Sequence, residues 1–171
     1  MITGIRRVAC VGSGLVGQGW ATLFALAGYQ VALEDVTEQK VEDALKRVEK
    51  QMRFLEVKGL ARGAKEAIQR LSGTTSLTEA IGRADYVQES VYESYPAKKE
   101  IYQKMDESTE PNVILASSTS GLMMSEIQTA AKLFPERCIV AHPWNPSYLV
   151  PLVEISPGVQ TSKKPSIRHG S

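Results

Sequence analysis

Two residues that could move a proton lie twelve positions apart near the end of the sequence. They are His142 and Glu154, and the segment between and after them carries Pro143, Pro146, Pro151 and Pro157. Proline fixes φ and lacks a backbone donor, so this segment is neither a helix interior nor an ordinary central strand. If the chain turns here and returns along residues 151–155, the carboxylate lies beside the imidazole and fixes its tautomer. The other ring nitrogen could then exchange a proton with a substrate. A histidine that is only packed or exposed is the alternative.

A second candidate is a glycine turn that joins an apolar strand to a helix-compatible run. Gly12, Gly14 and Gly17 have the spacing G-x-G-x-x-G. In a dinucleotide-binding turn the first glycine permits the bend, the second lets a pyrophosphate approach, and the third lets helix and strand pack closely. The anion would sit at the helix N-terminus. We therefore predict a cofactor contact along this turn, which also includes Leu15 and Val16; a plain tight turn would explain the glycines as well.

The acidic pair after the second predicted strand bears on the choice of cofactor. Asp35 lies eighteen residues after Gly17, where a carboxylate can accept hydrogen bonds from the adenosine ribose and repel a 2′-phosphate. Glu34, as the preceding strand residue, should point to the opposite face. The pattern favours NAD over NADP, while a flavin protein with the same fingerprint remains an alternative.

Hydroxyl groups follow a third apolar strand. The sequence "SSTS" (117–120) emerges at the carboxyl edge of the predicted sheet, where ligands of such sheets bind, and His142 ends the next strand at that edge. A hydroxyl-rich turn or helix cap is the other interpretation.

The elements that must position these residues alternate between strand and helix. Apolar runs predict strands at 5–12, 30–34, 86–90, 113–117, 138–142 and 151–155, and a short strand at 73–77. Apolar periodicity predicts helices at 15–27, 37–58, 64–71, 97–108 and 125–132, with Thr37 as an N-cap and Gly28 as a left-handed end. This alternation predicts an α/β fold, a Rossmann-type, doubly wound, mainly parallel sheet with helices on both faces.

Composition narrows the class of protein. The 171 residues suit one domain, and 20 Lys and Arg balance 19 Asp and Glu, which argues against a nucleic-acid surface. No apolar run is long enough to span a membrane. Cys10 and Cys138 lack metal-ligand or redox spacing, so we expect buried thiols, no metal site and a cytoplasmic protein.

Together these motifs resemble the NAD-binding domain of the L-3-hydroxyacyl-CoA dehydrogenase family, nearest its lambda-crystallin and L-carnitine dehydrogenase branch. The resemblance runs from about residue 5 to 158 and includes "ASSTSGLM", "PERCIVAHPWNP" and "YLVPLVEISPG". It implies NAD as cofactor and a 3-hydroxy acid or its CoA thioester as substrate. A non-catalytic NAD-binding module that retains this fold is the rival function.

The resemblance assigns roles to individual residues. His142 matches the catalytic base, Glu154 its carboxylate partner, and Ser120 the serine that contacts the reacting oxygen. The resemblance further implies substrate contact by Asn145 and cofactor contacts by Glu93, Lys98 and Ser118.

Two departures favour free hydroxy acids over CoA thioesters. Many acyl-CoA members have two aromatic residues where Pro143 and Trp144 stand, and asparagine in place of Ser118. Trp144 could stack on a trimethylammonium group or simply pack the loop against the sheet.

The resemblance also predicts the domain organisation. Residues 1–158 would form the NAD-binding domain with the His/Glu dyad, and residues 159–171 an irregular polar tail. The family's C-terminal helical domain, which closes over substrate and forms most of a homodimer interface, is absent from these 171 residues. We therefore expect the chain to bind NAD and to turn over hydroxy acids slowly.

Overall fold

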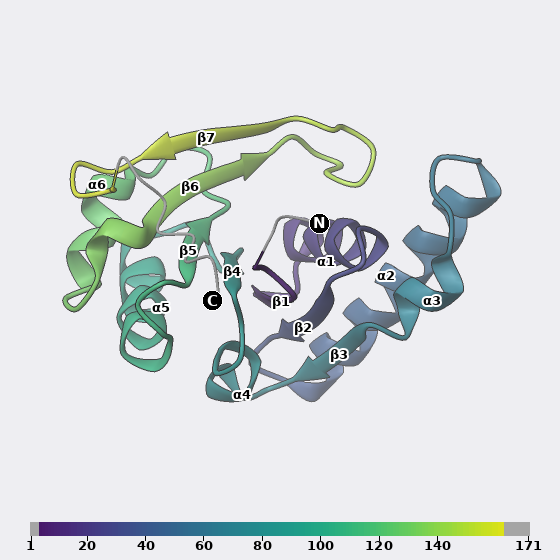
Figure 1. Cartoon of the computed structure of the whole chain (residues 1–171), viewed down its shortest axis with the longest axis horizontal. Coiled ribbons are helices and arrows are strands. Elements are labelled where there is room, and N and C mark those ends of the chain that lie inside the picture. The colour runs from purple at the N-terminus through teal and green to yellow at the C-terminus, as the bar shows by residue number, and fades with distance from the viewer. Residues whose placement is uncertain (1–3, 163–171) are drawn as a thin grey trace.

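The strands form one sheet in which the last strand, at one edge, runs opposite to the others. The computed structural model describes residues 4–162. Within them a seven-stranded sheet has the order β3-β2-β1-β4-β5-β6-β7 (Figure 1). All neighbours are parallel except β6 and β7, which are antiparallel. The strands are β1 Arg7–Val11, β2 Gln30–Glu34, β3 Leu71–Thr74, β4 Tyr86–Glu89, β5 Ile114–Ser117, β6 Cys138–Pro143 and β7 Val153–Pro157.

Helices cover both faces of the sheet, as the sequence predicts. The first layer contains α1 Leu15–Leu26, α2 Glu38–Val57 and α3 Ala64–Ile68, and the second contains α4 Leu77–Ile81, α5 Tyr95–Ser108 and α6 Met124–Ile127. Short 3₁₀ turns follow at Gln128–Ala130 and Pro135–Arg137. The Rossmann-type prediction is therefore confirmed. None of these described helices is long and apolar enough to cross a membrane.

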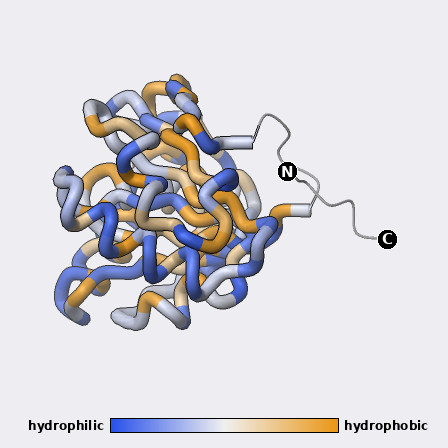
Figure 2. Tube along the Cα trace, turned by 90° about the vertical axis from the view of Figure 1, so that its left-hand side faces the viewer, coloured by the Kyte–Doolittle hydropathy of each residue, from blue (hydrophilic) through white to orange (hydrophobic). Residues whose placement is uncertain are grey.

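Side chains of β1 alternate between two cores. Val8 and Cys10 are buried against the first helical layer, while Ala9 and Val11 belong to the core under the second. Strand side chains point to opposite faces in turn, so a strand covered on both sides needs a continuous apolar run. Figure 2 shows hydrophobic segments crossing the interior of the molecule between more hydrophilic outer segments.

Two predicted helix ends are confirmed. Thr37 has an extended backbone and its side chain accepts a hydrogen bond from the Lys40 amide, which caps α2. Gly28 follows α1 with a φ of 99°, a conformation that glycine adopts without a Cβ penalty.

The structure corrects the prediction for residues 64–81. The predicted helix 64–71 ends at Ile68, and Leu71 begins β3, which the sequence placed at 73–77. Residues 77–81 form α4, which was not predicted, with Ser76 accepting from the Glu79 amide. A methyl group added at Gly73 would lie 2.4 Å from Val41 Cγ1, so contact with α2 fixes where β3 lies. Local propensity does not contain that contact.

The last strand also lies two residues later than predicted. It spans residues 153–157 rather than 151–155, and it runs antiparallel along the edge of the sheet. Pro151 and Pro146 lie in the loop before it, and Pro157 ends it, which are positions where a missing backbone donor costs little.

The start of the predicted tail is held against the domain. Residues 159–162 form no helix or strand, but Thr161 Oγ1 donates to the Cys138 carbonyl and the Ser162 amide to the Glu136 carbonyl. The rest of the predicted tail lies outside the described residues.

Candidate active site and cofactor-binding edge

The three glycines of the turn after β1 meet three different surroundings. Gly12 has a φ of 93°, and a methyl group there would lie 2.6 Å from the Ser90 carbonyl oxygen. A methyl group at Gly17 would lie 1.9 Å from the Gly12 carbonyl oxygen, whereas at Gly14 it would meet nothing within 4 Å. The fold itself therefore requires glycine at positions 12 and 17, because a larger side chain would clash with the backbone. Gly14 leaves open space at the N-terminus of α1, which fits the approach of a pyrophosphate.

Asp35 is held firmly at the end of β2. Its Oδ2 accepts from the Ser13 amide at 2.9 Å and the Ser13 hydroxyl at 2.8 Å, and its Oδ1 lies 3.3 Å from Lys40 Nζ. Burial alone would raise the pKa of Asp35, but hydrogen bonds from Ser13, Val36 and Lys40 together lower it. An ionised carboxylate thus stands beside the glycine turn, where it could accept hydrogen bonds from a ligand.

Glu34 has a different environment. Its residue surface is only 7% exposed, and burial, followed by repulsion from Asp35, raises its pKa to about 7. Since a carboxyl group in this position is partly protonated near neutral pH, Glu34 is the weaker candidate for a ribose contact.

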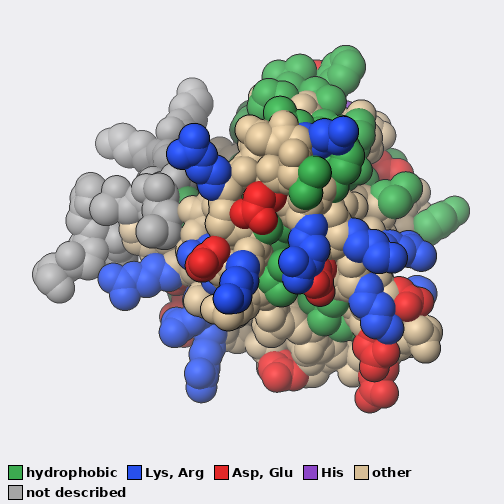
Figure 3. All heavy atoms as spheres, turned by 90° about the vertical axis from the view of Figure 1, so that its right-hand side faces the viewer, with side chains coloured by type: hydrophobic (Ala, Val, Ile, Leu, Met, Phe, Trp, Pro, Cys, Tyr) green, Lys and Arg blue, Asp and Glu red, His purple; other side chains and the backbone are tan. Residues whose placement is uncertain are grey.

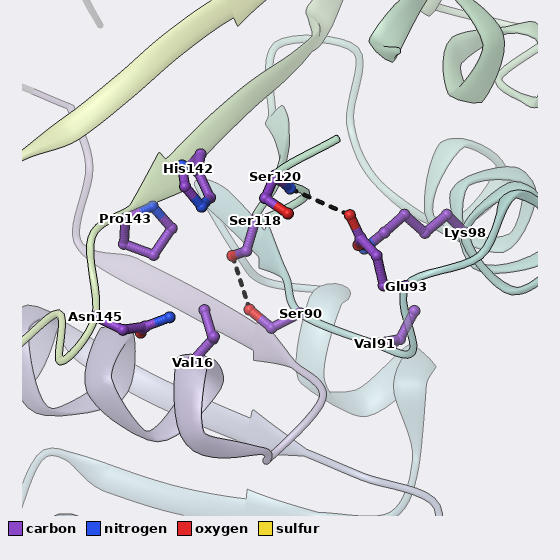
Figure 4. A pocket seen from close by; sticks show the side chains of 10 residues that line it. All are labelled: Val16, Ser90, Val91, Glu93, Lys98, Ser118, Ser120, His142, Pro143 and Asn145. Atoms are coloured by element: carbon purple, nitrogen blue, oxygen red, sulfur yellow. Dashed lines mark hydrogen bonds and ion pairs between the residues drawn. The ribbon is translucent and has the colours of Figure 1, made fainter. Parts of the chain in front are cut away.

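A cavity of about 230 Å³ lies at the carboxyl edge of the sheet. It is bordered by the first turn of α1, the ends of β4, β5 and β6, and the loops that follow them (Figure 4). Its lining contains six of the sequence-predicted site residues beside Val16, namely Glu93, Lys98, Ser118, Ser120, His142 and Asn145. It also contains Ser90, Val91 and Pro143. The glycines, Leu15, Asp35 and Glu154 are not in this lining.

His142 and Glu154 lie opposite each other on the adjacent strands β6 and β7. They are register partners in the antiparallel β6–β7 pair, and His142 Nδ1 lies 2.9 Å from Glu154 Oε2. The imidazole side chain is 25% exposed and the carboxylate 60% exposed. No described residue forms a hydrogen bond with Nε2 of His142, so this nitrogen is available to a molecule in the cavity. The arrangement can hold one tautomer and exchange a proton at Nε2.

Glu93 ties together two loops at the far side of the cavity. Its carboxylate accepts from the Thr119 hydroxyl and from the Ser120 amide at 3.1 Å, and lies 3.2 Å from Lys98 Nζ. Burial would raise the pKa of Glu93, but the bonds from Thr119, Lys98 and Ser120 lower it overall. The Ser120 hydroxyl itself has no partner among the described residues, so it remains available to a ligand.

Lys98 is almost completely buried and is held by a second carboxylate. Its Nζ lies 2.7 Å from Oε1 of Glu89, which is itself fully buried. Oε2 of Glu89 accepts from the Ser117 hydroxyl at 2.6 Å. A buried ammonium with two carboxylate partners is fixed in position. Glu89 was not among the predicted residues, although an acid inside the predicted strand 86–90 was a signal for it.

Ser118 lies at the centre of a hydrogen-bond network. Its Oγ lies 3.1 Å from Trp20 Nε1, 2.8 Å from Gln88 Nε2 and 2.8 Å from Ser90 Oγ. Ser90 was also missed by the sequence analysis, although it follows β4 in the same way that Ser118 follows β5. A hydroxyl at the carboxyl end of a buried strand is the shared signal.

Hydrophobic side chains are exposed around the hairpin that carries the dyad. Every residue of β7 is exposed, and Leu152, Val153 and Ile155 are 49%, 38% and 64% exposed. Figure 3 shows hydrophobic side chains gathered at the top of the molecule, the height at which the β6–β7 hairpin lies in Figure 1. Trp144 in the same loop is 50% exposed and does not line the cavity.

The residues in the described part of the chain contain no group of three or more His, Cys, Asp or Glu that could hold a metal ion. Cys10 and Cys138 are free and buried, and burial raises the pKa of both thiols.

Comparison with known proteins places this site in a family context. A family model described as "3-hydroxyacyl-CoA dehydrogenase, NAD binding domain" matches residues 7–167. The human lambda-crystallin homolog is 41% identical over 158 residues, which are 91% of this chain and 49% of that protein. L-carnitine dehydrogenase of Streptomyces coelicolor is 41% identical over 158 residues, 92% of this chain and 49% of that protein. The chain thus spans about half the length of these curated relatives.

Solved structures agree with the sequence relatives. The chain resembles (S)-3-hydroxybutyryl-CoA dehydrogenase from Ralstonia eutropha with a TM-score of 0.87 and 30% identity, covering 94% of this chain and 56% of that one. Sequence identity to this enzyme is lower than the 41% identity to the curated relatives, but the fold is closely similar.

Proposed function

The chain belongs to the 3-hydroxyacyl-CoA dehydrogenase family, and on that premise we propose that it binds NAD and supports hydride transfer at C3 of a 3-hydroxy acid. One observation carries the proposal. The first turn of α1, which follows the glycine turn, lines the same cavity as His142, whose Nδ1 is paired with Glu154. A dinucleotide that begins at the glycine turn and ends in this cavity would meet a general base.

The cofactor would lie along the carboxyl edge of the sheet. Gly12 and Gly17 would shape the turn around the pyrophosphate, while Gly14, Leu15 and Val16 would border the pyrophosphate itself. Asp35 would face the adenosine ribose. Glu93, Lys98 and Ser118 would border the nicotinamide half, since all three line the cavity. Bound NAD would supply the acceptor for the hydride that leaves C3.

The residues of the chain would then handle the proton. Nε2 of His142 takes the proton of the 3-hydroxyl group as the C3–H bond breaks and the carbonyl forms. Glu154 stabilises the imidazolium through Nδ1, and the Ser120 hydroxyl holds the reacting oxygen. Asn145, in the loop after β6, lines the cavity and would contact the substrate. Such proton transfer contributes about 10²- to 10⁴-fold in rate.

The substrate is best described by class. Relatives include enzymes named for L-carnitine and for 3-hydroxybutyryl-CoA. Pro143 and Ser118 favour a free hydroxy acid here, and the half-exposed Trp144 is accessible to a cationic group. Because the dyad is open to water, we expect this chain by itself to react orders of magnitude more slowly than a relative whose dyad is shielded from water. A homodimer and a cytoplasmic location are part of the same proposal.

The test combines binding with turnover on one sample. NADH is titrated by fluorescence, and NAD reduction is followed by absorbance with carnitine, gulonate, 3-hydroxybutyrate and 3-hydroxybutyryl-CoA at high protein concentration. We expect NADH binding and slow reduction with at least one free hydroxy acid. A chain that binds no NADH would refute the proposal.

A non-catalytic NAD-binding module is the second candidate. The exposure of Glu154 and of all of β7 favours it, because the side of the site that carries the dyad is uncovered. Binding of NADH without any turnover that depends on His142 would support this candidate.

A further inference from the structure

The hydrogen-bond network around Ser118 has a defined direction. Gln88 donates one Nε2 hydrogen to the Ala141 carbonyl at 3.2 Å, and a carbonyl can only accept, so the orientation of this amide is fixed. The second Nε2 hydrogen goes to Ser118 Oγ, while Oε1 of Gln88 accepts from the Tyr86 hydroxyl at 2.7 Å. Trp20 Nε1 is a donor only, and it donates to Ser118 as well.

These donors leave Ser118 a single choice for its own proton. A hydroxyl oxygen has two lone pairs, and the N–H groups of Trp20 and Gln88 occupy both. The remaining close partner is Ser90 Oγ at 2.8 Å, so Ser118 donates and Ser90 accepts. All three positions on the Ser118 oxygen are then used within the protein.

The proton of Ser90 is left without a partner among the described residues. Ser90 is half-buried and lines the cavity together with Ser118 and Val16, and Figure 4 shows its hydroxyl joined to that of Ser118. Ser118 occupies one lone pair of the Ser90 oxygen, and the Ser90 hydrogen can satisfy an acceptor oxygen of a molecule in the cavity.

The position of Ser90 indicates which molecule supplies that oxygen. The strand order reverses between β1 and β4, and Ser90 follows β4 at this reversal, where ligands of open α/β sheets bind. Its carbonyl lies against Gly12, the first residue of the glycine turn, and His142 borders the same cavity. The nicotinamide nucleoside of a bound dinucleotide would lie between the predicted pyrophosphate and the predicted base.

Resting on the proposed function, we infer that Ser90 is a further cofactor-binding residue whose hydroxyl donates a hydrogen bond to an oxygen of the nicotinamide nucleoside. Ser118 acts as its positioning residue, because it receives the Trp20 and Gln88 hydrogens and passes its own to Ser90. The oxygen belongs to either the carboxamide or the ribose of that nucleoside. Both are neutral acceptors, which suits an uncharged hydroxyl donor.

The test measures the affinities of the full chain for NADH, ADP-ribose and AMP. Ser90→Ala should weaken NADH binding between about twofold and tenfold, the range of one neutral hydrogen bond, and leave AMP unchanged. Ser90→Thr, which keeps the hydroxyl, should stay close to the parent. Weaker ADP-ribose binding would place the acceptor on the ribose, and unchanged ADP-ribose binding would place it on the carboxamide.

A double-mutant cycle tests the positioning role of Ser118. Ser118→Ala should weaken NADH but not AMP, and the double variant should bind NADH no more weakly than Ser90→Ala alone. Additive losses would mean that Ser118 has its own contact with the cofactor, which overturns the directed network.

Other outcomes overturn the Ser90 assignment. Ser90→Ala with parental NADH affinity would refute it, as would equal losses for NADH and AMP, which indicate general damage. A variant with unchanged NADH affinity but a raised KM for the hydroxy acid would assign the acceptor to substrate. A parent chain that binds neither NADH nor AMP would remove the proposed function and this inference together.

Discussion

The glycine turn and the β6–β7 hairpin, two parts of the carboxyl edge of the sheet, differ in how firmly their polar side chains are held and in how exposed they are. At the glycine turn, Asp35 accepts from an amide and a hydroxyl of Ser13 and pairs with Lys40, and Gly12 and Gly17 are enclosed by backbone. At the hairpin, one hydrogen bond joins His142 to a carboxylate that is 60% exposed, on a strand exposed throughout. The turn is preorganised for a ligand, whereas the dyad is aligned but uncovered. Binding and reaction should therefore respond separately to substitution.

The largest expected separation is at the hairpin. His142→Gln should lower turnover by about 10²- to 10⁴-fold, since it removes the base, and leave NADH affinity nearly unchanged. Glu154→Gln should cost less because the base remains and only its orientation and charge support weaken. Rates come from NADH absorbance and affinities from fluorescence titration. Full activity of the His142→Gln variant would exclude the dyad mechanism.

The glycine turn offers a matched pair of substitutions for the other side. Gly17→Ala should lower the free energy of unfolding by about 1 to 3 kcal/mol or prevent folding, because its methyl group meets the Gly12 carbonyl at 1.9 Å. Gly14→Ala should change stability by less than about 1 kcal/mol, since its methyl group enters open space. It should nevertheless weaken NADH at least tenfold.

Thermal unfolding and NADH titration of both variants decide this point. Parental NADH affinity in Gly14→Ala would show that the open space at α1 is not the pyrophosphate site.

A third prediction concerns Asp35, at the glycine-turn side of the site, and the preference for NADH over NADPH. NADH should bind more tightly than NADPH, and Asp35→Ala should reduce that gap by roughly tenfold, the value of one hydrogen bond to a charged group. Lys40, freed from its carboxylate partner at 3.3 Å, would then face a 2′-phosphate. Competition titrations with both cofactors measure the ratio. Equal affinities in the parent would contradict the role of Asp35.

The smallest effect concerns Glu34 and pH. Burial raises the pKa of Glu34 from 4.5 to about 7, so the folded protein favours its protonated form. Its contribution to stability is complete below about pH 4.5 and is lost as the pH rises through about 7. Glu34→Gln, which stays neutral, should therefore have a higher Tm than the parent at pH 8.

The same two proteins should differ little in Tm at pH 5. A constant difference across this range would indicate that Glu34 does not titrate near neutrality.

The parts of the site that follow from local sequence were predictable. The glycine spacing, Asp35 and the order of strands and helices depend on backbone conformation and periodicity within short segments. The prolines around residues 143–157 indicated a turn and return, which β6 and β7 make. Contacts between distant segments were not predictable from such signals. The close contact of Gly73 with α2 places β3 earlier in the sequence than predicted. Glu89 and Ser90 reach their partners only because β4 lies between β1 and β5.

The dyad also depends on how two strands are aligned, not only on which residues they carry. His142 lies opposite Glu154, with Val153 and Ile155 on either side of that partner. Sliding β7 by one residue would keep both functional side chains in the sequence, yet it would place valine or isoleucine opposite the imidazole and turn the carboxylate to the other face. Heritable changes in the length of the loop of residues 144–152 are therefore tolerated only where they preserve this alignment.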